Sequence, residues 1–291
     1  MREIKKLPIE VFGHDVENNT SSAQLARSQQ YCKYMKATCT KPRKSEPLIK
    51  VGICTLGASI KGGKMNPVIV CPQRFKEDIM FETIIQQYLM SWKNVRWVQE
   101  VSIGVGGSVD YVAVEVDAHD VVTDFLCVEI QAAGTTGTPY PYVKELLADG
   151  HFSGKRYSYG INWANEFSKT MLQQAYKKGK IVESWGRKIV FVVQDLAMEY
   201  LQQAVDCSLL TDYDPASPVD FCSFALMSRD DNSWNLEFGQ IRSTTIDGID
   251  LMLGGASVNE YPSEIDFMAN IMRKGIADGV FERNQYTKAF I

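Results

Sequence analysis

The pattern of apolar positions in the middle of the chain changes from helical to strand-like spacing. Between residues 75 and 92, apolar side chains recur every three or four positions, which predicts a helix with one apolar face. Its stripe consists of Phe81, Ile84, Ile85, Tyr88, Leu89 and Trp92. Three short segments rich in β-branched and aromatic residues follow. They predict strands at Val95 to Ile103, Val109 to Val116 and Phe125 to Gln131.

The helical period returns after these strands. A second apolar stripe is formed by Ala164, Phe167, Met171, Leu172, Ala175 and Tyr176. Gly179 is expected to end this helix, and Lys188 to Gln194 is expected to form a buried strand because it is almost continuously apolar. Farther along, Phe221 to Met227 and Leu236 to Ile241 predict a strand hairpin, and Ser263 is expected to cap a last helix.

Two carboxylates and an amide that could bind a metal ion stand on the second and third of the three adjacent predicted strands. Asp110 lies on the second strand, whereas Glu129 and Gln131 share one face of the third, because side chains alternate along a strand. If Asp110 comes alongside, two carboxylates could bind Mg²⁺ and leave coordination positions for water and a phosphate. The pattern therefore indicates metal-assisted phosphodiester hydrolysis. Ordinary polar residues at strand ends are the alternative interpretation.

The seven cysteines fall into two groups. Three are scattered, at Cys127, Cys207 and Cys222, and four lie in the first quarter of the chain. The intervals of six, fourteen and sixteen residues between those four are looser than in a zinc ribbon. Four thiolates would suit tetrahedral iron or zinc, and buried free thiols are the alternative. The four early cysteines are Cys32, Cys39, Cys54 and Cys71.

Basic residues cluster in two places that could contact a phosphate backbone. Residues 33–44 contain five of them and no acidic residue, which favours a DNA-backbone contact over a merely exposed loop. These five are Lys33, Lys36, Lys41, Arg43 and Lys44. The second predicted helix carries four lysines on or near its expected exposed side, although solvated lysines would show the same pattern. These are Lys169, Lys177, Lys178 and Lys180.

Length and composition restrict the class of protein. A chain of 291 residues with 45% hydrophobic content can bury a sizeable core. Its net charge of −4 argues against a protein that coats DNA generally, but not against one that binds through a local basic patch. No secretory signal and no apolar run long enough to span a membrane is visible, so reduced thiols and a cytoplasmic location are expected.

The order helix, three strands, helix, strand, with carboxylates on the second and third strands, resembles the core of the PD-(D/E)XK nuclease superfamily. A closer resemblance comes from residues around this core. Four segments and the early cysteines are similar to the NotI-type restriction endonucleases, from about residue 7 to about residue 195. The segments are Leu7 to Gly13, Gly107 to Asp110, Glu129 to Gln131 and Gly160 to Trp163.

This resemblance implies a bacterial type II restriction endonuclease that cuts both strands of a palindromic, GC-rich DNA site. It also implies a homodimer and a cognate DNA methyltransferase. The catalytic Mg²⁺ would bind Asp110 and Glu129, with Gln131 at the position where most relatives have Lys. Gln131 can orient a water molecule but has no basic form. Glu100 on the first strand matches an additional active-site carboxylate of the family, and an exposed strand residue is its alternative interpretation.

For the N-terminal part, the resemblance implies an iron, alternatively a zinc, held by the four early cysteines. The expected architecture is an α/β protein with three parts. Residues 1–74 would form the four-cysteine metal-binding segment, residues 75–210 the nuclease core, and residues 211–291 an α/β extension packed on the core. Two other functions stay open at this point. One is a DNA repair or recombination nuclease of the same superfamily, and the other is a non-catalytic DNA-binding protein that contains a metal.

Overall fold

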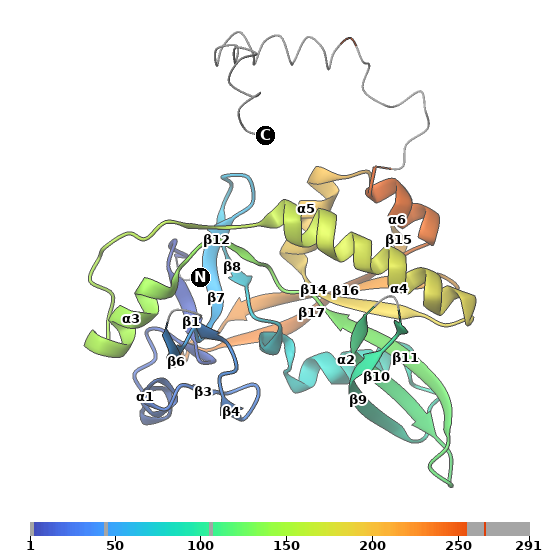
Figure 1. Cartoon of the computed structure of the whole chain (residues 1–291), viewed down its shortest axis with the longest axis horizontal. Coiled ribbons are helices and arrows are strands. Elements are labelled where there is room, and N and C mark those ends of the chain that lie inside the picture. The colour runs from blue at the N-terminus through green and yellow to red at the C-terminus, as the bar shows by residue number, and fades with distance from the viewer. Residues whose placement is uncertain (1–2, 44–45, 105–106, 255–264, 266–291) are drawn as a thin grey trace, which may run out of the picture. The chain divides into compact units, whose positions relative to one another are not determined.

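The computed structural model describes residues 3–43, 46–104, 107–254 and 265 (Figure 1). The described residues up to Gly254 belong to one compact unit. The predicted last helix lies outside the described residues except for Ile265, which is helical. In the part of the chain that is described, no helix is long and apolar enough to cross a membrane.

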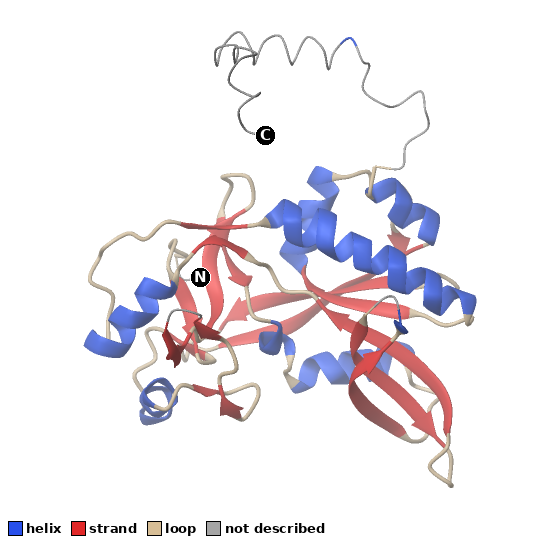
Figure 2. Ribbon diagram, in the orientation of Figure 1, coloured by secondary structure: helices blue, strands red, loops and turns tan. Residues whose placement is uncertain are grey.

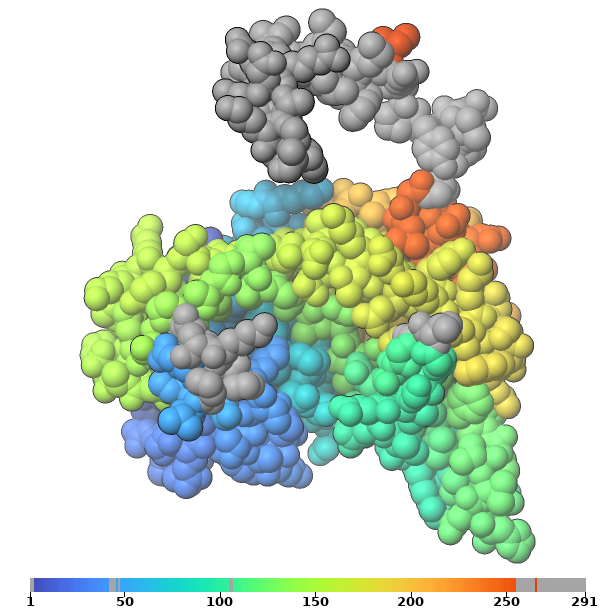
Figure 3. Space-filling model, viewed as in Figure 1, coloured from blue at the N-terminus to red at the C-terminus, as the bar shows by residue number. Residues whose placement is uncertain are grey.

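A seven-stranded mixed sheet forms the centre of this unit, in the order β15-β17-β16-β14-β11-β10-β9. Strands β9, β10 and β11 pair antiparallel, whereas β11, β14 and β16 run parallel to one another. The strands are β9 (Val95–Ser102), β10 (Ser108–Val116), β11 (Val122–Ile130), β14 (Ile189–Gln194), β15 (Thr211–Asp212), β16 (Val219–Ser228) and β17 (Trp234–Thr244). The turn between β10 and β11 protrudes at one end of the surface (Figure 3).

Helices cover both faces of this sheet. Helix α2 (Asp78–Tyr88) packs on one face, in a buried cluster with alternate residues of β10, β11 and β14. The opposite face carries a π-helical segment, η3 (Ala164–Met171), which continues directly into α4 (Leu172–Ser184). Two further helices, α5 (Asp195–Ala204) and α6 (Ile246–Met252), lie on that same face (Figure 1). The middle strands of the central sheet, above all β14 and β16, are therefore buried on both faces, which suits their apolar sequences, whereas the edge strand β9 is largely exposed.

A separate four-stranded sheet, in the order β2-β1-β7-β8, lies beside one end of the central sheet (Figure 2). It consists of β1 (Pro8–Val11), β2 (His14–Asp15), β7 (Ile53–Ser59) and β8 (Met65–Ile69). Helix α3 (Tyr140–Asp149) shares a buried cluster with this sheet. The remaining short elements are α1 (Ser21–Ser28), β3 (Tyr31–Cys32), β4 (Ala37–Thr38), β5 (Pro42–Arg43), β6 (Glu46–Lys50), η1 (Pro72–Phe75), β12 (Thr135–Gly137) and β13 (Tyr159–Ile161).

Buried polar contacts tie the N-terminal sheet to the central sheet. Arg74, which is fully buried, forms an ion pair of 2.7 Å with Glu10 of β1 and donates to the carbonyl oxygen of Trp234 at 2.7 Å. The indole nitrogen of Trp234 in turn donates to Asp15 of β2 at 2.6 Å. Breaking such a network would leave buried charges without partners, so the two sheets are held in a fixed relation within the unit.

Most of the predicted elements are confirmed. The helix, three antiparallel strands, helix and parallel strand follow in the expected order, and the C-terminal hairpin of β16 and β17 is present. Gly179, however, does not end its helix, since α4 continues to Ser184. A Cβ atom at Gly179 would lie 2.7 Å from Cγ2 of Val219 and 2.9 Å from Cδ1 of Ile246. This glycine therefore allows α4 to pack closely against β16 and α6 instead of stopping the helix.

Candidate active site

Three carboxylates occupy facing positions on three neighbouring strands. The β10–β11 register pairs Tyr111 with Val128, which places Asp110 opposite Glu129. The β9–β10 register pairs Val109 with Val101 and Tyr111 with Gln99, so Glu100 falls opposite Asp110. Directly opposed residues in an antiparallel pair lie on the same face, with Cβ atoms about 5 Å apart. Asp110 and Glu129 thus share one face, and Glu100 stands at the matching register position of β9, where its backbone interrupts the strand alternation. These three positions are called the carboxylate row; in the described residues their side chains are not arranged to hold a metal ion as they stand.

Glu100 has an unusual backbone conformation within this row. Its φ is +54°, in the left-handed region that side-chain-bearing residues seldom adopt inside a strand. Such strain is found preferentially at functional sites, where the surrounding structure holds it in place. The side chain is exposed. Its register position and its backbone are compatible with a role at the site, and its exposure is equally compatible with a surface residue of β9.

Asp110 is anchored to the neighbouring strand by its own side chain. Its Oδ2 atom accepts a hydrogen bond of 2.8 Å from the backbone N–H of Ile130. Ile130 is the last residue of β11, so this bond links the two strands beside the site. It also limits the rotation of the Asp110 carboxylate and fixes where its oxygens point.

Glu129 is buried and forms an ion pair with Lys178 of α4. The Lys178 ammonium also donates to the carbonyl oxygen of Ser108 at 2.7 Å and to Oε1 of Gln174 at 3.1 Å. Its three N–H bonds therefore have three protein acceptors, as an ammonium group that is only 3% exposed requires. The prediction that Lys178 lies on the exposed side of its helix is wrong, because the side chain points inward to Glu129.

The carboxyl group of Glu129 is in an environment that favours its neutral form. Burial raises the pKa of Glu129 to about 7, and the nearby charge of Asp110 adds to the increase, while the hydrogen bond from Lys178 lowers it. A divalent cation between Asp110 and Glu129 would remove their mutual repulsion and favour the ionised form. A proton and a cation would therefore compete for the Glu129 carboxylate.

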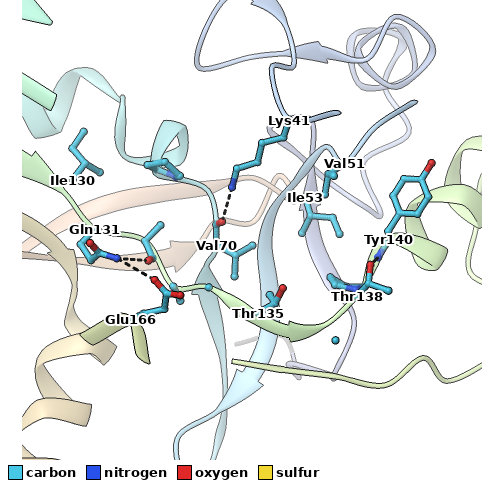
Figure 4. Close-up of a pocket in the computed structure, with 16 residues that line it drawn as sticks. Lys41, Val51, Ile53, Val70, Ile130, Gln131, Thr135, Thr138, Tyr140 and Glu166 are labelled. Atoms are coloured by element: carbon cyan, nitrogen blue, oxygen red, sulfur yellow. Dashed lines mark hydrogen bonds between the residues drawn. The ribbon is translucent and has the colours of Figure 1, made fainter. Parts of the chain in front are cut away.

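Gln131 lies just beyond the end of β11 and lines a cleft of about 460 Å³ (Figure 4). Its side-chain nitrogen donates to the carbonyl oxygen of Ala132 at 3.1 Å and to Oε2 of Glu166 at 3.5 Å. Glu166 belongs to the π-helical segment η3 and lines the same cleft. Lys41, one of the predicted DNA-contacting residues, lies across this cleft, where its ammonium donates to the carbonyl oxygen of Val70 at 3.2 Å.

The other predicted DNA-contacting side chains are on the surface where they are described. Lys33, Lys36, Lys41 and Lys169 are exposed. Lys44 and the side chain of Arg43 lie outside the described part of the structure.

The four early cysteines line one small cavity of about 40 Å³, although they come from separate segments. Cys32 belongs to β3 and Cys54 to β7, whereas Cys39 and Cys71 stand in connecting loops. Burial raises the pKa of the Cys32, Cys54 and Cys71 thiols, and nearby cysteines raise it further. In the described residues, no group of three or more His, Cys, Asp or Glu side chains is arranged so that it could hold a metal ion as it stands. The structure thus brings the four thiols to one cavity but does not orient them as ligands.

The sequence predicted Lys178 only as an exposed phosphate-facing lysine and did not predict Glu166, although one signal of a buried role was available for Lys178. Met171, Ala175 and Val182 mark the buried stripe of the helix, and Lys178 falls on it, three residues after Ala175 and four before Val182. A lysine on a buried stripe needs a buried acceptor. Glu166 carries no comparable signal, because its position depends on the π-helical backbone.

A mixed α/β fold with a row of carboxylates beside a cleft is compatible with an α/β nuclease. The family model of the restriction endonuclease NotI matches residues 10–214, which is well over half of the chain. The chain therefore belongs to the NotI restriction endonuclease family, a family of DNA-cleaving hydrolases, and the resemblance inferred from its motifs is confirmed. A comparison with curated proteins gave no match.

Proposed function

We propose that the protein is a type II restriction endonuclease of the PD-(D/E)XK superfamily. It hydrolyses both strands of a palindromic, GC-rich DNA site in a Mg²⁺-dependent reaction and acts as a homodimer beside a cognate methyltransferase. The observation that carries this proposal is the placement of Asp110 opposite Glu129 on β10 and β11, in a chain of the NotI family. The order of helix, antiparallel strands, helix and parallel strand also supports the superfamily.

The donor set fits Mg²⁺, which prefers oxygen ligands and retains several waters. Asp110 and Glu129 would hold the cation. When bound, it would activate a water molecule and stabilise the charge that develops on the phosphate. Asp110 is held for this task by the N–H of Ile130, and Glu129 by the ammonium of Lys178. Glu100 completes the carboxylate row on β9 and would contribute a further oxygen ligand or orient a water.

Gln131 is uncharged, so the positive charge near the proposed metal site comes from Lys178 of α4. All three N–H bonds of Lys178 are directed at protein acceptors, so it acts through Glu129 and makes no direct contact with the phosphate. Gln131 can orient the attacking water through its amide but cannot remove the proton of that water. The proton must therefore pass to another group, either solvent or the DNA phosphate.

The position of Lys41 supports a path for the DNA backbone. Lys41 and Gln131 line the same cleft, so a strand lying in it would contact the basic segment at one side and the carboxylate row near the other. Lys33 and Lys36 are exposed on the same basic segment, and Lys169 is exposed on η3. These lysines would contact phosphates, together with Arg43 and Lys44, and would bind without regard to base sequence.

An iron or zinc ion would fit the cavity of the four early cysteines by its ligand chemistry. Thiolates are the preferred ligands of both ions, and a cation would offset the mutual repulsion of buried thiolates. A cavity of about 40 Å³ has room for one such ion. Binding would require the side chains of Cys32, Cys39, Cys54 and Cys71 to turn inward. The ion would then tie β3, β7 and two loops together beside Lys41.

Digestion of a sequenced plasmid tests the proposal. Purified protein with Mg²⁺ is expected to give discrete fragments with constant ends, and Asp110→Ala is expected to give none while still binding DNA in Ca²⁺. Removing a metal ligand takes away water activation and charge stabilisation together, so a loss of at least ~10³-fold is expected. Nicking or smearing would favour a repair nuclease. Absence of any Mg²⁺-dependent cleavage would favour a non-catalytic DNA-binding protein.

A further inference from the structure

Gln131 has an amide whose two ends differ in chemistry, and its orientation decides which end meets the reacting atoms. The nitrogen can only donate a hydrogen bond, whereas the oxygen can accept one or bind a cation. Both acceptors that the structure places near the nitrogen, the carbonyl oxygen of Ala132 and the carboxylate of Glu166, belong to the protein itself. Within the described part of the chain, no donor contacts Oε1 of Gln131.

We propose that Glu166 is a positioning residue that holds the Gln131 amide by its nitrogen, so that the amide oxygen stays free to meet the reacting groups. This inference rests on the proposed nuclease function. Glu166 accepts from the Gln131 nitrogen at 3.5 Å, and the Ala132 carbonyl accepts from it at 3.1 Å, which accounts for both of its hydrogens. Gln131 then meets a water, or the cation held by Asp110 and Glu129, as an oxygen acceptor and not as a donor.

Backbone hydrogen bonds fix the position of Glu166 relative to the segment that follows Gln131. The N–H of Asn162 donates to the carbonyl oxygen of Gly134 at 2.9 Å, and the N–H of Glu166 donates to the carbonyl oxygen of Asn162 at 3.0 Å. Two successive backbone bonds thus connect the loop after β11 to the start of η3. The π-helical conformation of this segment is rare and occurs often at functional sites.

Gly134 provides independent support. A Cβ atom on this residue would overlap with the carboxylate of Glu166, although the φ of Gly134 is outside the left-handed region. The backbone therefore does not require glycine at this position, and the Glu166 carboxylate is the group that a larger residue would displace. Because this carboxylate ends a flexible side chain, its displacement should cost little stability.

Glu166→Ala is expected to slow single-turnover cleavage by about 10- to 100-fold, because a misoriented group beside the reaction costs rate more than binding. Affinity for the cleavable duplex in Ca²⁺ and the melting temperature should stay close to those of the wild type. Gly134→Ala should reproduce this loss in part, since it moves the Glu166 carboxylate without changing Glu166 or Gln131. Glu183→Ala removes an exposed carboxylate from the continuation of the same helix and is the matched control.

A double-mutant cycle tests whether Glu166 affects the cleavage rate through Gln131. If Glu166 acts through Gln131, Glu166→Ala should have no further effect in a Gln131→Ala background. Losses that multiply in the double variant would overturn the proposal and make Glu166 an independent catalytic group. An activity-free measurement completes the test. A crystal structure of Glu166→Ala should show a rotated Gln131 amide, and an unchanged amide would overturn the inference even if the wild type did not cleave DNA.

Discussion

Lys178 of α4 and Glu129 of β11 form a buried ion pair within the carboxylate row. The pair connects a helix to the strand that carries the acidic site, and Lys178 also holds the carbonyl oxygen of Ser108 at the start of β10. A buried charge that loses its partner is costly, whereas a fully neutral replacement can be tolerated. The geometry of the site is therefore linked to the stability of the fold through this single lysine.

Lys178→Met is expected to lower the free energy of unfolding by about 1–2 kcal/mol at pH 8, because loss of Lys178 raises the Glu129 pKa further and the buried carboxyl must take up a proton. The loss should be smaller at pH 6, where Glu129 takes up a proton. Single-turnover cleavage should slow by at least ~10-fold, since the Glu129 carboxylate loses the partner that fixes its position. Urea unfolding at both pH values and quenched cleavage assays measure these effects.

A double variant separates stability from catalysis. Glu129→Gln combined with Lys178→Met should regain stability at pH 8 because no unpaired charge remains, but it should not regain cleavage. Lys64→Met, at an exposed lysine outside the cleft, serves as the control. If Lys178→Met were equally stable at both pH values and cleaved normally, the pair would have neither of the roles assigned to it.

The sequence was sufficient to predict the sheet elements that carry the site. Alternation along β11 correctly placed Glu129 on the face of Cys127, opposite the face of Leu126 and Val128. That prediction succeeds because β11 is extended as far as Ile130, so that its side chains alternate between the two faces. The pairing of Asp110 with Glu129 does not follow from the apolar pattern alone, because strand register also depends on turn geometry.

The parts of the site that sequence patterns missed depend on tertiary packing. Gly179 was predicted to end the helix, but it serves the close approach of α4 to Val219. The same approach brings Lys178 to Glu129, so both errors have one cause. Glu166 could not be predicted because a π-helical segment changes which residues share a face of the helix. The spacing of the four cysteines likewise gave no indication that they line one cavity.

Cation affinity is expected to fall with decreasing pH through the titration of Glu129. Its pKa is raised to about 7 in the folded protein, so below pH 7 a proton competes with the cation. The apparent affinity for Ca²⁺ should decrease by up to about tenfold for each pH unit below 7. Calorimetric titration between pH 5.5 and 8 measures this affinity, and Glu129→Gln is the variant that cannot take up the competing proton. Constant affinity over the range would contradict the role of Glu129 as a ligand.

The same raised pKa predicts how metal-free stability depends on pH. A carboxyl group whose folded pKa is above its unfolded value of 4.5 stabilises the fold fully below about pH 4.5 and loses that contribution as pH rises through about 7. The metal-free wild type should therefore lose stability relative to Glu129→Gln as the pH rises from about 4.5 to about 7. Mg²⁺ should restore stability to the wild type at pH 8, because a ligand that binds only the folded state stabilises it.

Purified protein is expected to contain one iron or zinc per chain in the cysteine cavity. Cys54→Ser should lower metal content and thermal stability together, because metal binding in such a site contributes directly to folding. Cys207→Ser is the matched control, since this half-buried cysteine lies outside the cavity. Elemental analysis measures the metal content of each variant, and thermal unfolding measures its stability. Stable wild-type protein without metal would make Cys32, Cys39, Cys54 and Cys71 ordinary buried thiols.

The protein is expected to cut duplex DNA as a symmetric dimer. One set of Asp110, Glu129 and Gln131 can hydrolyse one strand, so a double-strand break at a palindrome requires two sets related by a two-fold axis. Sedimentation with a cleavable duplex should give two chains per duplex. Affinity should fall steeply with salt, with a logarithmic slope of about −0.9 for each phosphate neutralised by lysines and arginines of both chains.

A substitution at Lys41 tests whether the DNA backbone lies in the cleft lined by Lys41 and Gln131. Lys41→Ala should reduce the slope by about two units in a symmetric dimer, because each chain would lose one phosphate contact. Lys64→Ala should leave the slope unchanged, since Lys64 is exposed outside the cleft. A single chain bound to the duplex, with nicked DNA as the only product, would contradict the dimer and support a repair nuclease. An unchanged slope for Lys41→Ala would instead move the DNA path away from this cleft.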